Sequence, residues 1–243
     1  LRVSASVDLG SNKQVLRLTG SNFVLVAINS VTATFANTVN LDRAAAVVDS
    51  SLTDTKQAAL AKYGFAQTDF SQEWTVLPMG GGTTTDDPTL DLCNGKFASE
   101  SDRLERRQVV VSKPRSPYAF LSSEVVRYSS VAAAQAAQKE LVKVLAQCQA
   151  DKGYTDATGA LMPYTFAEIK NIPAGVVGEG SRVFVRATID SGANARQLLG
   201  FYQFNGAIFT GLYVLTTSEV AYTDAQVATW LQVAATMASR LKG

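Results

Sequence analysis

Residues 182–216 read RVFVRATIDSGANARQLLGFYQFNGAIFTGLYVLT, and this stretch decides the fold. Over Arg182–Ile189, valine, alanine and isoleucine occupy every second position, which is the period of a β-strand with one face on a core. Two further apolar runs, Leu198–Phe204 and Ala207–Thr216, flank the pair Asn205-Gly206, which is a strong β-hairpin signal. The stretch therefore predicts an antiparallel β-meander.

Two helices are predicted outside the meander. One spans Asp224–Leu241, where Thr223 and Gln226 have the spacing of a capping box. The other spans residues 130–150, where apolar side chains recur every three to four positions as far as Cys148. Strands joined by hairpins, with the helices apart from them in sequence, predict an α+β fold in which helices pack on an antiparallel sheet.

The rest of the chain gives weaker signals, from which two domains are expected. Residues 1–50 are interpreted as an N-terminal, strand-rich extension, and residues 51–243 as the α+β domain. The expected elements are strands at 13–18, 23–28, 109–111 and 118–128, a helix in one or two pieces over 41–64, and a loop over 78–89.

The composition excludes several classes of function. The chain has no histidine, which removes Ser-His-Asp and Cys-His catalysis and most zinc sites. Its 22 Lys and Arg residues balance 21 Asp and Glu residues, whereas nucleic-acid binding proteins usually carry clustered positive charge. No apolar run has the roughly 20 residues of a membrane helix. We therefore expect no catalysis, metal, cofactor or nucleic acid, and a membrane link only through an anchor upstream of this chain.

The chain has two cysteines, Cys93 and Cys148, which are too far apart for a Cys-x-x-Cys redox motif. They are either reactive thiols or one disulfide, and the disulfide is the prediction. Closing a loop of about 55 residues would stabilise the fold by about 4 kcal/mol in the chain-entropy model. A structural disulfide would also place the protein in an oxidising compartment, outside the cytoplasm.

Several of these features occur together in a known group of domains. Residues 90–96 contain Cys93, residues 99–108 are rich in arginine, and residues 123–128 precede the alanine-rich helix that ends at Cys148. This order resembles the extracytoplasmic sensor-type domains of actinobacteria, found on PknH-like receptor kinases and on cell-envelope lipoproteins. The resemblance covers residues 55–243 and implies an α+β domain with a cleft and no known enzymatic activity. Such domains commonly have more than one disulfide, whereas this chain can form only one. The resemblance assigns no functional role to any residue of this chain.

Five charged residues are candidates for ligand binding: Arg103, Arg106, Arg107, Glu124 and Arg127. The three neighbouring arginines offer planar donor groups that suit a carboxylate or phosphate. They are equally suited to pair with Asp102, Glu105 or Glu124. Glu124 and Arg127 interrupt an otherwise apolar strand, and either form a structural pair or line a cleft.

We therefore expect an extracytoplasmic, ligand-binding or sensor-like domain of a lipid-anchored or secreted envelope protein. Its ligand or protein partner is unknown, and the expected cleft lies between the sheet and the loop around residues 78–92. One alternative is a hydrolase that uses two carboxylates, which requires two facing Asp or Glu side chains in a deep pocket. The other is a protein-interaction module, which requires an exposed apolar patch.

Overall fold

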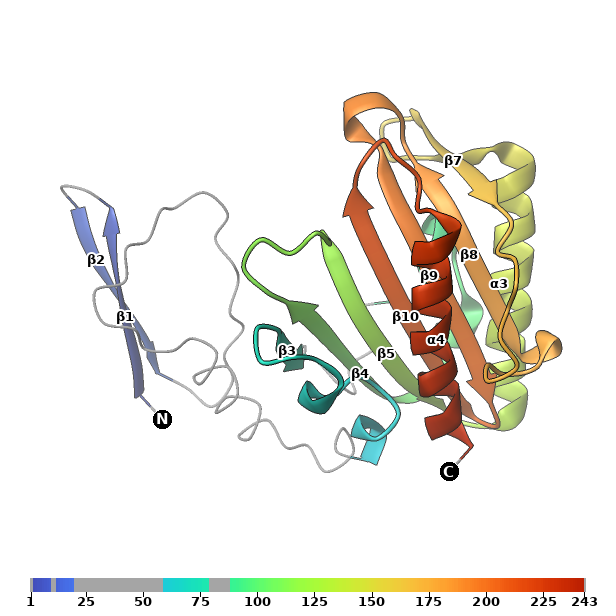
Figure 1. The fold of residues 1–243 in the computed structure, drawn as a ribbon, viewed down its shortest axis with the longest axis horizontal. Helices are drawn as coiled ribbons and strands as arrows, with labels where there is room; N and C mark the ends of the chain where they lie inside the picture. Colours follow the sequence, from blue (N-terminus) through green and yellow to red (C-terminus); the bar gives the residue numbers. More distant parts are fainter. Residues whose placement is uncertain (1, 10–11, 20–58, 79–87, 243) are drawn as a thin grey trace. The chain divides into compact units, whose positions relative to one another are not determined.

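The computed structural model describes residues 2–9, 12–19, 59–78 and 88–242 (Figure 1). The chain divides into two compact units, Leu1–Asp54 and Thr55–Gly243. The first unit contains an antiparallel hairpin of β1 (Arg2–Leu9) and β2 (Asn12–Thr19). β2 includes the strand expected at 13–18. The strand expected at 23–28, most of the helix expected at 41–64 and most of the loop expected at 78–89 lie outside the described residues.

The second unit is built on an eight-stranded sheet with the order β3-β4-β5-β10-β9-β8-β7-β6. Every neighbouring pair in it is antiparallel. Its strands are β3 (Thr75–Pro78), β4 (Arg103–Ser112), β5 (Phe120–Tyr128), β6 (Gly153–Thr155), β7 (Leu161–Ala167), β8 (Arg182–Ile189), β9 (Arg196–Asn205) and β10 (Ile208–Thr217). The predicted α+β class is confirmed.

The predicted meander forms three consecutive strands of this sheet, β8, β9 and β10. The β9–β10 hairpin closes at the pair Asn205↔Ile208. Gly206 in its turn has φ +58°, a left-handed conformation that glycine adopts without strain. Strand alternation sends Tyr202 into the core on one side of the sheet and Phe201 into the core on the other.

One long helix covers each face of the sheet (Figure 1). α3 (Val131–Asp151) begins at Ser130, whose hydroxyl accepts a hydrogen bond from the backbone N–H of Ala133. α4 (Asp224–Leu241) begins at Thr223, which forms the predicted capping box with Gln226. No helix in the described part of the chain is long and apolar enough to span a membrane.

β4 begins earlier than the sequence indicates. Only residues 109–111 were expected to be extended, but the strand starts at Arg103 and pairs with β5 from Arg103↔Tyr128, with a bulge between Arg103 and Glu105. The charged residues at its start are poor strand formers by themselves. They are held in the sheet because neighbouring elements supply partners of opposite charge.

The predicted disulfide is present between Cys93 and Cys148, whose Cα atoms are 6.1 Å apart. It joins the short 3-10 turn η2 (Leu92–Asn94) to the last third of α3. Both cysteines are buried, and Leu90, Leu92 and Phe97 pack with them against the α3 side of the sheet. The bridge thus fixes the segment after residue 88 over that face.

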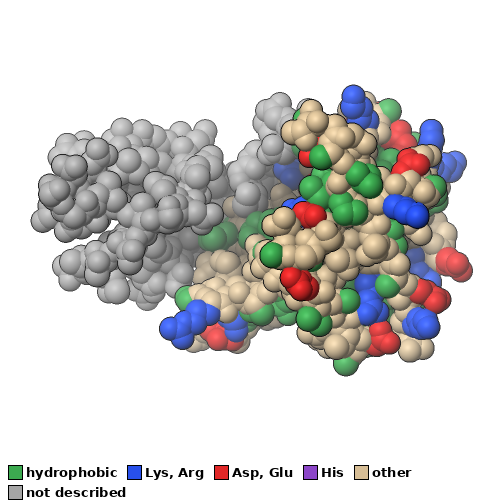
Figure 2. All heavy atoms as spheres, turned by 90° about the horizontal axis from the view of Figure 1, so that it is seen from above, with side chains coloured by type: hydrophobic (Ala, Val, Ile, Leu, Met, Phe, Trp, Pro, Cys, Tyr) green, Lys and Arg blue, Asp and Glu red, His purple; other side chains and the backbone are tan. Residues whose placement is uncertain are grey.

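The second unit has a mixed surface charge. Figure 2 shows basic and acidic side chains interspersed on the face in view. Among the described residues, no group of three or more His, Cys, Asp or Glu side chains is arranged to hold a metal ion.

Candidate functional site

A cavity of about 240 Å³ opens on the α3 side of the sheet, beside the segment that leads to η2. Its lining combines a charged group near β4 and β5 with aromatic and aliphatic side chains from β5, β7, β8, β9 and β10. The lining residues are Pro88, Thr89, Asp91, Leu92, Arg106, Gln108, Phe120, Glu124, Tyr164, Ile189, Leu198, Tyr202, Tyr213 and Leu215. We refer to this cavity as the sheet pocket.

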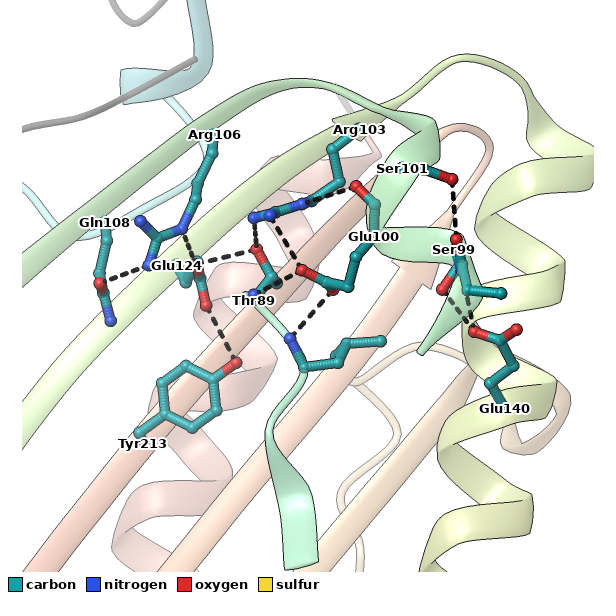
Figure 3. Close-up of polar contacts among 12 residues, drawn as sticks. Thr89, Ser99, Glu100, Ser101, Arg103, Arg106, Gln108, Glu124, Glu140 and Tyr213 are labelled. Atoms are coloured by element: carbon teal, nitrogen blue, oxygen red, sulfur yellow. Dashed lines mark hydrogen bonds and ion pairs between the residues drawn. The ribbon is translucent and has the colours of Figure 1, made fainter. Parts of the chain in front are cut away.

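Glu124 of β5 is the centre of the charged group (Figure 3). Its Oε1 accepts hydrogen bonds from Arg106 Nε and from Thr89 Oγ1, the latter at 3.2 Å. Its Oε2 accepts a hydrogen bond of 3.2 Å from the Tyr213 hydroxyl. Glu124 is 2% exposed and Arg106 is 7% exposed, so this is a buried ion pair with both carboxylate oxygens occupied.

A second ion pair holds residues 88–91, which we call the segment above the sheet, in place. The Arg103 guanidinium lies 3.0 Å from Glu100 and also donates to Thr89 Oγ1. The Glu100 carboxylate accepts hydrogen bonds from the backbone N–H groups of Thr89, at 2.8 Å, and Leu90, at 3.1 Å. Thr89 is therefore bonded to both ion pairs, and the network joins this segment to β4 and β5 (Figure 3).

Burial controls the ionisation of this group. It raises the pKa of Glu124 to about 7, because the loss of hydration outweighs the opposing effect of the Arg106 charge. Burial also raises the pKa of the Tyr213 hydroxyl well above its ordinary value, and the Glu124 carboxylate adds to that shift. Tyr213 consequently remains a neutral hydrogen-bond donor to Glu124 at physiological pH.

A repeated Gly-x-Tyr pattern makes room for the aromatic side chains. Residues two apart in a strand share a face, so the Tyr213 ring lies over Gly211 and the Tyr202 ring over Gly200. A Cβ atom on Gly211 would lie 2.4 Å from the Tyr213 hydroxyl oxygen, and one on Gly200 would lie 3.0 Å from the Tyr202 ring. The two glycines therefore let the tyrosine rings lie along the sheet.

The structure brings together three of the five predicted binding residues. Arg106 and Glu124 line the sheet pocket, and Arg103 belongs to the adjoining network. Arg107 and Arg127 follow Arg106 and Val126 in their strands and therefore point to the opposite face.

Arg127 Nε donates to Glu105 Oε2 at 2.9 Å. Arg127 and Glu124 are thus on different faces and do not pair with each other. Each of them instead has a partner on the neighbouring strand β4. The Arg106–Glu124 pair is one of those that the sequence offered, and the Arg127–Glu105 pair is not.

Four polar residues of the sheet pocket were not among the sequence candidates: Thr89, Gln108, Tyr202 and Tyr213. Gln108 accepts a hydrogen bond of 2.8 Å from Arg106 and donates one of 3.2 Å to Ser122. The two tyrosines lie in the predicted meander, where aromatic side chains are common strand residues. The Gly-x-Tyr pattern in adjacent strands is the signal that would have placed them on one face with space around their rings.

The fold and the pocket define a class of domain: an antiparallel sheet with a helix on each face and a pocket beside a disulfide-anchored segment. No protein-family model and no curated protein matches the chain. Among solved structures, it is similar to the extracellular domain of PknH from Mycobacterium tuberculosis, with a TM-score of 0.48 and 11% sequence identity. The match covers 76% of this chain and 96% of that chain.

Proposed function

We propose that this chain is a non-catalytic, extracytoplasmic domain that binds a small ligand in the sheet pocket, as a sensor or carrier at the cell envelope. The observation that carries the proposal is the pocket itself. A buried Glu124–Arg106 pair, in which both carboxylate oxygens accept hydrogen bonds, lies at one side of it, and aromatic and aliphatic side chains line much of the rest. A concave, mostly apolar site with a few fixed polar groups is the usual form of a small-molecule site.

The disulfide supports the proposed location. Structural disulfides persist in oxidising compartments and are rare in the bacterial cytosol. Both cysteines are buried, and together they anchor the segment that borders the pocket. The sequence resemblance includes envelope lipoproteins, and a lipid-anchored or secreted form is part of the proposal. Alkylation of unreduced protein from intact cells should label neither cysteine, and labelling of both would contradict this location.

The rival hydrolase hypothesis has one observation in its favour, because two carboxyl side chains, Asp91 and Glu124, line the same pocket. Glu124 is badly placed for acid or base chemistry, however. Its two oxygens already accept hydrogen bonds from Arg106, Thr89 and Tyr213, so a substrate proton would have to displace one of these donors. We therefore favour binding without turnover.

The proposal is tested by a thermal-shift screen of envelope glycans, lipids and small metabolites. Three proteins are compared: wild type, Leu215→Trp, which fills the sheet pocket, and Val142→Trp on the exposed surface of α3 as a matched control. Circular dichroism establishes that each variant is folded. Compounds that stabilise wild type and Val142→Trp but not Leu215→Trp would support the proposal.

Two results would overturn it. No stabilising compound in any class, or equal stabilisation of Leu215→Trp, would remove the sheet pocket as the ligand site. Chemical conversion of a bound compound by wild type, with loss of conversion in Asp91→Asn, would replace the binding role by the hydrolase role.

A further inference from the structure

The charges of the sheet pocket are unfavourable for an anionic ligand. In the described part of the chain, the charged residues that line it are Asp91, Arg106 and Glu124, which are two carboxylates and one guanidinium. Arg106 is already paired with Glu124, and the neighbouring Arg103 is paired with Glu100. An anion at either guanidinium would lie beside a carboxylate that is already paired with it.

Two polar groups in the pocket are still available to a ligand. Tyr202 is only 2% exposed, yet its hydroxyl makes no hydrogen bond within the described part of the chain. The carboxylate of Asp91, on the segment above, likewise makes no ion pair or hydrogen bond with another described residue. Both groups line the same cavity.

The surroundings of these two groups favour positive charge. Burial raises the pKa of the Tyr202 hydroxyl, and the negative charge of Asp91 raises it further. Tyr164 and Phe120 also line the cavity, and the Tyr202 and Tyr213 rings are 5.6 Å apart. Aromatic faces attract cations, particularly where water is excluded. The positive charge of Arg196 lowers the pKa of the Tyr164 hydroxyl, but Arg196 is not among the residues that line the cavity.

We infer that the sheet pocket binds a small organic cation, with its ammonium group at Asp91 and against the rings of Tyr164 and Tyr202. A cavity of about 240 Å³ accommodates an amine of a few carbon atoms. The inference rests on the proposed function and adds the chemical class of the ligand to it. The Tyr202 hydroxyl supplies a hydrogen bond to a polar group of the same molecule.

The test uses the whole chain, one cation with its neutral isostere, and a second cation with two simple anions. Calorimetric titration compares choline with its neutral isostere 3,3-dimethylbutan-1-ol, and tetramethylammonium with acetate and inorganic phosphate. We expect both cations to bind at least tenfold more tightly than the neutral or anionic probes. Asp91→Asn should weaken cation binding roughly tenfold and leave the neutral isostere unchanged.

A matched control separates a local effect from a change in net charge. Glu168→Gln removes one exposed negative charge outside the sheet pocket and should leave cation binding unchanged. Tyr202→Phe should weaken choline, which has a hydroxyl, more than tetramethylammonium, which has none. This difference would not arise if the substitution merely disturbed the fold.

The outcomes distinguish the inference from the proposed function. Equal binding of cation and neutral isostere, tighter binding of an anion, or no loss of affinity in Asp91→Asn would overturn the inference. If the cations fail but another compound binds wild type and not Leu215→Trp, the binding function stands and only the ligand class is wrong. If nothing binds in either experiment, both proposals fail.

Discussion

Three side chains explain how the Glu124 carboxylate is accommodated in the core on the α3 side of the sheet. Glu124 loses its hydration on burial, and three donors replace the lost water: Arg106, Thr89 and Tyr213. Such pairs are often neutral for stability but costly to break, because one charge is then left without a partner. The network joins β4, β5, β10 and residues 88–91, and loss of one member should cost more than the pair contributes to stability.

The ionisation of Glu124 predicts a pH dependence. Its pKa is raised from 4.5 to about 7 in the folded state, so the folded protein holds this proton more tightly than the unfolded chain does. The resulting stabilisation is complete below about pH 4.5 and is lost as the pH rises through about 7. The stability of wild type relative to Glu124→Gln should therefore fall between these values and stay constant above them.

Urea unfolding of both proteins at pH 4.5, 6 and 8 measures this difference. Glu168→Gln, at an exposed position, serves as the control and should show no such trend. A wild-type advantage that grows with pH would mean that the Arg106 charge, and not burial, dominates the pKa of Glu124.

The Gly-x-Tyr pattern gives a second prediction at the residue scale. Gly211→Ala should destabilise the fold by about 1–3 kcal/mol, because the new Cβ overlaps the Tyr213 side chain and moves its hydroxyl away from Glu124. Gly180→Ala is the control, since no atom lies within 4 Å of a Cβ there. Its effect should be within about 0.5 kcal/mol. Equal effects in a denaturant titration would refute the role of Gly211.

Among the secondary-structure elements, the helices and the meander are the ones that local sequence defines. The ends of α4 follow from its capping box and its apolar period, and β8 follows from strict alternation. The first half of β4 could not be predicted in this way. Its arginines and glutamate are extended only because β5 and the segment above supply partners distant in sequence, such as Glu124 for Arg106. The pocket has the same origin, since its lining comes from six strands and one loop.

The cap of α4 can be tested by itself. Thr223→Ala removes the hydroxyl that accepts a hydrogen bond from the Gln226 N–H, and should destabilise the second unit by about 1 kcal/mol. Thr229→Ala is a matched change on the exposed side of the same helix, where the hydroxyl bonds only to the Ala225 carbonyl. We expect it to be neutral or slightly stabilising, because alanine is the better helix former. The midpoint of urea unfolding should therefore be lower for Thr223→Ala than for Thr229→Ala.

At the scale of the whole molecule, the disulfide connects stability with the pocket. Cys93 immediately follows the segment that carries Thr89, Asp91 and Leu92, all of which line the cavity, and Cys148 lies in the helix on the same face. The cysteine pair was predictable from the sequence because no other cysteine competes for it. That the bridge borders the pocket depends on how the segment crosses the sheet, which no local pattern specifies.

Removal of the bridge should therefore have two effects. The double variant Cys93→Ala/Cys148→Ala should lose about 2–4 kcal/mol in urea unfolding. It should also bind any pocket ligand more weakly, at a temperature where it is still folded, because the segment with Asp91 is no longer fixed to α3. Loss of stability with unchanged affinity would show that the remaining contacts, such as Thr89 and Leu90 with Glu100, hold the segment sufficiently.

The central claim is that the sheet pocket is the ligand site, and a crystal structure of the protein soaked with its best stabilising compound tests it most directly. The account predicts ligand density between Asp91 and the tyrosines of β7 and β9, next to an intact Glu124–Arg106 pair. Density in another cavity, such as the one between α4 and Phe70, with the sheet pocket empty, would contradict it.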